Sequence, residues 1–251
     1  MKLFKSIPEW QAWRDTLQEG PLGFIPTMGA LHQGHLSLIE ASRSENTLTV
    51  VSIFINPKQF DESADFEAYP ANHQQDLNRL ENAGVDAVLL PDAGQIYKDD
   101  YRFKITEREF SRRLCGAHRP GHFDGVLTVV MRLLNLVRPD NAYFGEKDYQ
   151  QLQLIRDMTS AFFMPVNIVA CATVRETDGL AMSSRNQHLD DRQRLRAAAL
   201  YASLKQGPTV DQARQRLARL GFEIDYVEDI AGRRLAAVKL GNTRLIDNVE
   251  I

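Results

Sequence analysis

Two histidines three residues apart, His32 and His35, lie in a glycine-containing segment suited to binding a transferring phosphate group. The segment, PTMGALHQGHL at residues 26–36, follows the apolar run GFI and leads into a helical pattern. Gly29 and Gly34 would let a ligand approach the backbone, and a helix N-terminus offers unpaired N–H groups that favour phosphate. At helical spacing both imidazoles can donate to the oxygens of a phosphoryl group under attack. A zinc pair is usually spaced four apart with a third ligand nearby, so we predict a nucleotide site.

A second polar group follows the apolar run LTVVSIFI at residues 48–55. Asn56 and Gln59 offer neutral amides, which can fix a small hydroxy acid or a β-amino acid without burying a charge. A turn that ends the strand accounts for Asn56 and Pro57, but it leaves Gln59 unexplained.

Two further segments carry groups that suit a triphosphate. In YFGEKDYQQ at residues 143–151, Gly145 permits close approach, Lys147 supplies a flexible charge, and Asp148 can cap a helix or hold a ribose. In AMSSRN at residues 181–186, Ser183, Ser184 and Arg185 supply hydroxyl donors and one fixed charge. Taken alone, the second segment is an ordinary polar loop, and it gains meaning from the motifs that precede it.

These motifs resemble a known superfamily and, more narrowly, one family within it. His-x-Gly-His resembles the signature of the nucleotidylyltransferases, which include class I aminoacyl-tRNA synthetases. The wider string PTMGALHQGH, with residues 51–60, 119–126, 143–151 and 174–186, is similar to the pantothenate synthetase (pantoate–β-alanine ligase) family. Met-Ser-Ser-Arg at residues 182–185 resembles the second superfamily signature, Lys-Met-Ser-Lys-Ser, with Ala181 and Ser184 in place of its lysines. That replacement is expected in the ligase family.

The resemblance implies an ATP-dependent ligase that joins pantoate to β-alanine through a pantoyl adenylate, releasing AMP and pyrophosphate. It implies Mg²⁺ on the phosphates and a homodimer. The implied catalytic residues are His35, as acid/base, His32 and Lys147. The implied ATP-binding residues are Met28, Gly29, His32, Gly34, His35, Gly145, Glu146, Lys147, Asp148, Val174, Met182, Ser183, Ser184 and Arg185. Gln59, Gln151 and Asn56 are implied for pantoate and β-alanine, and we assign no role to His122 or Arg119.

Strand and helix patterns alternate along the first two-thirds of the chain, and these elements must position the residues named above. Strand patterns at 23–25, 48–55, 86–90, 141–144 and 166–171 are separated by helical patterns, which predicts an α/β, Rossmann-like, doubly wound parallel sheet. Such sheets bind ligands at the carboxyl ends of their strands. We expect a nucleotide- and pantoate-binding domain over residues 1–173 and a smaller C-terminal α+β lid domain over residues 174–251. In the latter we expect helices at 190–205 and 210–220, followed by strands. The step from Glu228 to Leu235 is abrupt, so we expect this sheet to be abbreviated relative to the family.

Composition and net charge bear on which partners and functions the chain could have. Thirty Lys and Arg residues against 33 Asp and Glu residues give a net charge of −3. This charge disfavours nucleic acid or a membrane surface as partner. We expect a cytoplasmic protein with two reduced cysteines, Cys115 and Cys171. Two alternatives remain: another nucleotidylyltransferase of the same signature, and a non-enzymatic RNA- or nucleotide-binding module. The second would use the arginines at 192, 194, 196, 214 and 216.

Overall fold

The computed structural model describes residues 1–251 except 18, 19, 61–65 and 68, and it divides into two compact units. Unit 1 comprises Met1–Leu31, His35–Gly145 and Gln150–Cys171. Unit 2 comprises His32–Gly34, Glu146–Tyr149 and Ala172–Ile251. Two short segments of the first two-thirds of the chain therefore belong with the C-terminal part.

A six-stranded parallel sheet forms the centre of unit 1, in the order β1-β4-β3-β2-β5-β6. Its strands are β1 (Lys2–Phe4), β2 (Leu22–Thr27), β3 (Leu48–Ile53), β4 (Ala87–Leu89), β5 (Asn141–Gly145) and β6 (Asn167–Cys171). The chain moves from β2 outward to β3 and β4, and then returns to β5 on the other side of β2. The carboxyl ends of β3, β2 and β5 are therefore neighbours, and strand order reverses between β2 and β5.

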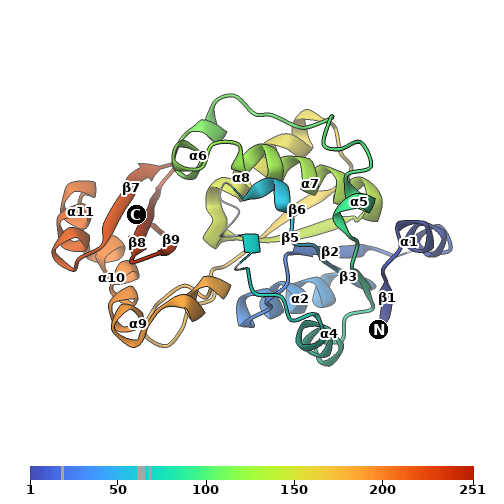
Figure 1. Ribbon diagram of the computed structural model, residues 1–251, viewed down its shortest axis with the longest axis horizontal. Helices are drawn as coiled ribbons and strands as arrows, with labels where there is room; N and C mark the ends of the chain where they lie inside the picture. Colours follow the sequence, from blue (N-terminus) through green and yellow to red (C-terminus); the bar gives the residue numbers. More distant parts are fainter. Residues whose placement is uncertain (18–19, 61–65, 68) are drawn as a thin grey trace. The chain divides into compact units, whose positions relative to one another are not determined.

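Helices cover both faces of this sheet (Figure 1). On one side lie α2 (Gln33–Glu45) and α4 (His73–Asn82), and on the other lie α7 (His122–Val137) and α8 (Tyr149–Ala161). The shorter elements of unit 1 are α1 (Ile7–Arg14), η1 (Pro57–Gln59), α5 (Ala93–Ile96), η2 (Phe110–Arg112) and α6 (Cys115–His118). The apolar, β-branched sequence of β3 matches this double cover, because five of its six residues are buried. One buried cluster joins Ile25, Val51 and Val88 of the sheet to Ile39 and Leu80 of the helices.

Unit 2 contains a three-stranded antiparallel sheet with helices packed against it. The strands β7 (Glu223–Ile230), β8 (Arg233–Leu240) and β9 (Thr243–Glu250) follow one another in sheet order. The other elements are η3 (Glu146–Asp148), η4 (Ser184–His188), α9 (Asp191–Ala197), α10 (Ala199–Gln206) and α11 (Val210–Arg219). Leu200, Leu204 and Leu217 of the helices pack with Val227 and Val238 of the sheet, so unit 2 has its own core.

The predicted fold class is confirmed: a doubly wound parallel sheet is accompanied by a smaller α+β part. All five predicted strands of the larger sheet are present, and β1 is an additional edge strand. The single helix predicted at 190–205 is wrong in one respect, because α9 and α10 divide at Ala198.

Candidate active site

The loop between β2 and α2 is held by a buried carboxylate. Asp76 of α4 is 2% exposed and accepts the backbone N–H groups of Ala30 (2.9 Å) and Leu31 (2.8 Å). Gly29 adopts φ +83°, and a Cβ there would lie 2.9 Å from Oδ2 of Asp76. The glycine is therefore required both by the backbone conformation and by the carboxylate. Asp76 serves as an anchor for this loop, a role that its position 45 residues downstream did not reveal.

His32 immediately precedes α2, and its ring is oriented by the backbone. The N–H of Gly34 donates to Nδ1 of His32 at 3.1 Å, so a neutral imidazole carries its proton on Nε2. A Cβ on Gly34 would lie 2.9 Å from Cε1 and 3.0 Å from Nδ1 of the same ring. The absence of a side chain at Gly34 thus permits the ring position. His35 lies in the first turn of α2, so the predicted helix start at the histidine pair is close to the observed one.

Asn56 lies at the end of the loop after β3 and is 1% exposed. Its Nδ2 donates to Oε1 of Gln59 and to the carbonyl of Gly125, each at 3.1 Å. Its Oδ1 accepts the hydroxyl of Tyr97 at 2.6 Å and the N–H of Lys58 at 3.2 Å. Burial raises the pKa of the Tyr97 hydroxyl, which keeps this donor protonated. The side-chain amide of Asn56 thus uses both of its N–H donors and both acceptor sites of its oxygen inside unit 1. This geometry favours a role in positioning Gln59 over direct contact with a substrate.

The backbone of Gln59 is held by two side chains to which the sequence assigned no role. Nδ1 of His122 lies 2.7 Å from the Gln59 carbonyl, and Nη2 of Arg119 donates to the same oxygen at 3.2 Å. Nη1 of Arg119 lies 3.2 Å from Nε2 of His122. Because a carbonyl only accepts and a guanidinium only donates, the neutral ring protonated on Nδ1 satisfies both contacts. The side chain of Gln59 also donates to the sulfur of Met28.

Two consecutive glutamines at the start of α8 differ in environment. Gln150 is buried and accepts the N–H of Cys115 at 3.0 Å, while its Nε2 donates to the carbonyls of Phe110 (2.7 Å) and Arg113 (2.8 Å). Gln151, the predicted pantoate ligand, is half-buried. Gln150 therefore anchors the segment at 110–115, whereas the amide of Gln151 beside it is partly accessible.

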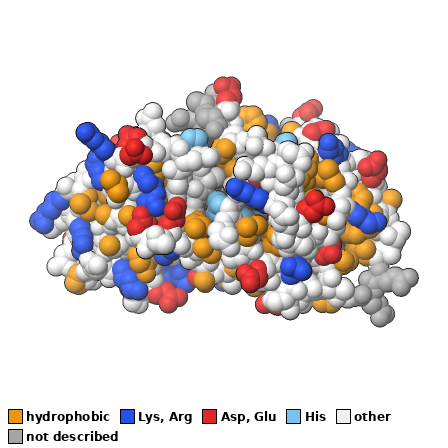
Figure 2. All heavy atoms as spheres, turned by 90° about the horizontal axis from the view of Figure 1, so that it is seen from below, with side chains coloured by type: hydrophobic (Ala, Val, Ile, Leu, Met, Phe, Trp, Pro, Cys, Tyr) orange, Lys and Arg blue, Asp and Glu red, His pale blue; other side chains and the backbone are white. Residues whose placement is uncertain are grey.

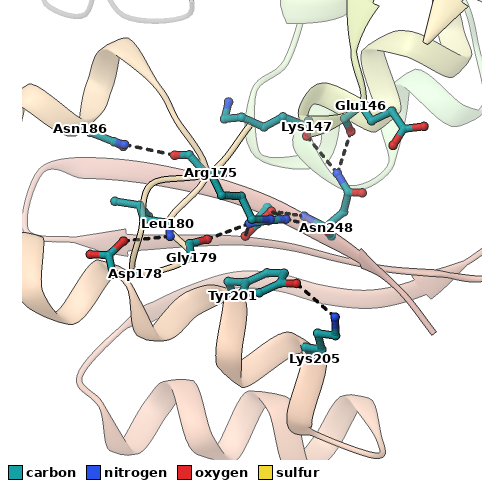
Figure 3. A network of polar contacts seen from close by, with 12 residues as sticks. Glu146, Lys147, Arg175, Asp178, Gly179, Leu180, Asn186, Tyr201, Lys205 and Asn248 are labelled. Atoms are coloured by element: carbon teal, nitrogen blue, oxygen red, sulfur yellow. Dashed lines mark hydrogen bonds and ion pairs between the residues drawn. The ribbon is translucent and has the colours of Figure 1, made fainter. Parts of the chain in front are cut away.

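The turn after β5 carries Lys147 and is tied to the C-terminal sheet (Figure 3). Nδ2 of Asn248 in β9 donates to the carbonyls of Glu146 (2.8 Å) and Lys147 (3.1 Å). Nζ of Lys147 lies 3.5 Å from the carboxylate of Asp148. A Cβ on Gly145 would meet no described atom of its own unit within 4 Å, and Gly145 has no positive φ. Neither packing in unit 1 nor backbone conformation therefore requires glycine at this position.

The segment at 174–186 folds back on itself within unit 2. Met182 donates its N–H to the carbonyl of Val174 at 3.0 Å, and Arg175 pairs with Ala181 in an isolated bridge. Ser183 caps η4 by accepting the N–H of Arg185 at 3.3 Å. The predicted residues Met182, Ser183, Ser184 and Arg185 are half-buried.

An ion pair with a buried carboxylate and a partly buried arginine joins the start of this segment to β9. Arg175 contacts both oxygens of Asp247, at 2.7 and 2.9 Å, and its guanidinium lies 3.9 Å from the ring centroid of Tyr201. It also donates to the carbonyls of Gly179 (3.0 Å) and Asn248 (3.2 Å) (Figure 3). Burial raises the pKa of Asp247, and Arg175 opposes that rise. Sequence reasoning missed this pair, which joins residues 72 positions apart.

The predicted site residues divide between the two units. Unit 1 contains Met28, Gly29, His35, Asn56, Gln59, Gly145 and Gln151. Unit 2 contains His32, Gly34, Glu146, Lys147, Asp148, Val174, Met182, Ser183, Ser184 and Arg185. Each histidine of the pair is thus assigned to a different unit. In the part of the chain that the structure describes, no three His, Cys, Asp or Glu side chains form a group able to hold a metal ion.

Two of the arginines considered for the RNA- or nucleotide-binding alternative form ion pairs or hydrogen bonds within unit 2. Arg194 pairs with Asp178 (2.6 Å) and Glu176 (3.1 Å), and these contacts raise its pKa. Arg196 donates to the carbonyls of Leu220 and Gly221. On the face shown in Figure 2, positive and negative side chains of the described residues are interspersed. No helix among those residues is long and apolar enough to cross a membrane.

Known proteins resemble this chain along nearly its whole length. The family model described as pantoate-beta-alanine ligase matches residues 2–250. The chain is 52% identical over 250 residues to the pantothenate synthetase of Bdellovibrio bacteriovorus, covering 100% of this chain and 99% of the relative. It is 47% identical over 249 residues to that of Legionella pneumophila, covering 99% of each chain. The chain is therefore not shortened relative to these two proteins, and the expected abbreviation of the C-terminal sheet relative to the wider family stays a prediction.

Solved structures agree with the sequence relatives. The pantoate-beta-alanine ligase of Francisella tularensis, complexed with Beta-gamma ATP and β-alanine, superposes with a TM-score of 0.95 at 38% identity, covering 100% of this chain and 97% of that one. The pantothenate synthetase of Thermus thermophilus gives 0.92 at 39% identity, covering 100% and 99%. Given the end-to-end match of sequence and fold, the chain belongs to the pantoate–β-alanine ligase family of enzymes.

Proposed function

We propose that this chain joins pantoate to β-alanine in two steps that consume ATP. In the first, the pantoate carboxylate attacks the α-phosphate of ATP, giving pantoyl adenylate and pyrophosphate. In the second, the amine of β-alanine attacks the acyl carbon, giving pantothenate and AMP. The observation that carries the proposal is topological: the loops with His32, Gln59 and Lys147 follow three adjacent parallel strands at their carboxyl ends. The ligands of the Francisella tularensis relative, Beta-gamma ATP and β-alanine, support it.

The histidines act on the α-phosphate in the first step. His32 accepts the Gly34 N–H at Nδ1, so its neutral ring has the proton on Nε2, and this N–H donates to an oxygen of the phosphoryl group as charge builds on it. His35, in the first turn of α2, serves as acid/base and donates beside the helix N-terminus. Gly29 and Gly34, with Met28, let the nucleotide approach the backbone of this loop.

Cationic and hydroxyl groups hold the leaving pyrophosphate. Lys147 supplies a mobile positive charge, and Arg185 supplies a planar donor set. Ser183 and Ser184 add hydroxyl donors. Gly145, Glu146, Asp148, Val174 and Met182 complete the proposed ATP contacts.

Neutral amides select the acceptor substrates. Gln59 and Gln151 bind pantoate, and Gln59 also serves β-alanine. Asn56 contributes by fixing Oε1 of Gln59 at 3.1 Å, while His122 and Arg119 fix its carbonyl. A neutral set suits a hydroxy acid better than a phosphorylated alcohol, which would need cationic residues.

Mg²⁺ is proposed to bind with the nucleotide, where it neutralises part of the triphosphate charge. The described residues contain no cluster of three or more His, Cys, Asp or Glu side chains that could hold a metal ion. In this proposal the ion is held mainly by phosphate and water oxygens. Asp148, with a side chain 45% exposed, suits a contact through water. Asp76 is less suited, because it is 2% exposed and both of its oxygens accept backbone N–H groups of the β2–α2 loop. The lid role of residues 174–251 and the homodimer stay predictions.

The test is measurement of AMP and pyrophosphate release from MgATP with pantoate, with β-alanine, with both and with neither. We expect sustained AMP release only when both substrates are present, and pyrophosphate release with pantoate alone limited by retention of the adenylate. Turnover with a phosphorylated alcohol and none with pantoate would instead support another nucleotidylyltransferase. Absence of any nucleotide turnover would support a binding module.

Replacing Gly34 with alanine is expected to reduce AMP formation far more than it reduces stability. The new Cβ would lie 2.9 Å from Cε1 of His32, so the ring must rotate and lose the contact with the Gly34 N–H. We expect kcat to fall on the order of 100-fold, as for a misplaced catalytic group. Gly94→Ala is the matched control, since a Cβ there meets Asp92 at an ordinary 3.4 Å. Equal rates for the two variants would contradict the orienting role of Gly34.

A further inference from the structure

The backbone of the Lys147 turn receives its hydrogen bonds from the C-terminal strand β9 (Figure 3). Asn248 is 3% exposed, and its Nδ2 donates to the carbonyls of Glu146 and Lys147 at 2.8 and 3.1 Å. One amide group thus holds two consecutive peptide units of η3, the short turn that presents the Lys147 side chain.

The orientation of the Asn248 amide is itself fixed. Its Oδ1 accepts from Nη1 of Arg233 at 2.7 Å, which leaves Nδ2 to face the turn. Nη2 of the same guanidinium pairs with Glu146 at 3.0 Å and with Glu250 at 2.8 Å. Arg233 therefore contacts the amide and the turn together, and a rotated amide would lose both the arginine and the two carbonyls.

Strand β9 is also anchored at the residue before Asn248. Nη1 and Nη2 of Arg175 donate to the two carboxylate oxygens of Asp247, and Nη2 also donates to the Asn248 carbonyl at 3.2 Å. The β8–β9 pairing sets Arg233 opposite Glu250, two residues beyond Asn248. The contacts of the sheet thus fix the amide, and the amide fixes the turn.

We propose that Asn248, held by Arg233, is a positioning residue for Lys147 in the ATP-dependent step. The inference rests on the function proposed above, in which Lys147 holds the departing pyrophosphate. Asn248 makes no contact with substrate in this scheme. It acts by keeping the carbonyls of residues 146 and 147, and with them the lysine Cα, in one place.

The test is Asn248→Asp combined with Lys147→Met in a double-mutant cycle. An aspartate keeps the shape and the Arg233 contact, but it sets a carboxylate oxygen against two carbonyls. We expect pyrophosphate formation with pantoate and MgATP to fall on the order of 100-fold, with a raised KM for ATP and an unchanged KM for pantoate. In the Lys147→Met background the same change should have little further effect, because its target is already gone.

Asp225→Asn is the control, because it makes the reverse acid–amide exchange at the Arg244–Asp225 pair of the same sheet and leaves the turn untouched. Equal losses in the wild-type and Lys147→Met backgrounds, or equal losses for both exchanges, would overturn the inference in favour of general destabilisation. If Asn248→Asp does not fold, Arg233→Met tests the same contact by freeing the amide to rotate. Its KM for ATP should rise, and an unchanged value would overturn the inference. Inactivity of the wild-type chain would instead refute the proposed function.

Discussion

Replacing His35 with alanine is expected to lower kcat for AMP formation by about 10²–10⁴-fold, the usual contribution of a positioned acid/base group. His35 lies in the first turn of α2, where an imidazole and the helix N-terminus would act on the same phosphoryl oxygens. The change is small for the fold, since the side chain is only half-buried. The measurement is the rate of pyrophosphate release from MgATP and pantoate in a single turnover.

The control for this variant is His73→Ala, which removes an exposed histidine from the start of α4. It should retain the wild-type rate and the wild-type thermal midpoint. His35→Asn adds a further comparison, because an amide can donate to phosphate without transferring a proton. A rate for His35→Asn close to that of the wild type would leave His35 as a donor only, and full activity of His35→Ala would contradict both roles.

The larger sheet could be predicted because its strands carry a strong local signal. The run at residues 48–55 is apolar and largely β-branched, and it forms the buried strand β3. Strand β1 escaped prediction because it has three residues, lies at the sheet edge and is mostly exposed. The division between α9 and α10 also lacked a signal, since Ala198 at the junction is a good helix former with neither glycine nor proline beside it.

The residues that hold the site were less accessible to sequence reasoning. Asp76, His122 and Asn248 act on backbone atoms that are 45 to 102 positions away in the chain. The spacing of residues along the chain does not indicate such long-range contacts, whereas motif resemblance points to side chains that are expected to face a ligand. Asn56 illustrates the difference: its amide has the chemistry of a substrate ligand, and its burial assigns it to the support of Gln59.

Replacing Lys147 with methionine is expected to lower the rate of pantoyl adenylate formation by about 10²–10³-fold, as for loss of one fixed donor to a developing charge. Methionine preserves much of the aliphatic stem, so the loss should come from the charge. Lys147→Arg should recover part of the rate, because it restores the charge in a bulkier, planar form. Lys205→Met is the matched control in unit 2, where Lys205 contacts the hydroxyl of Tyr201 at 3.3 Å.

A second measurement separates the two steps. Lys147 is assigned to the pyrophosphate, which leaves in the first step, so it should have no part in the attack of β-alanine on the acyl carbon. When pantoyl adenylate is supplied directly, Lys147→Met should form pantothenate and AMP at nearly the wild-type rate. A large loss in this second step would contradict the assignment, because it would mean that the ammonium group binds the adenylate or β-alanine. Losses confined to the first step would instead support an interaction of the Lys147 charge with the departing phosphates. They would also support the inference that Asn248 holds the turn so that Lys147 can make this interaction.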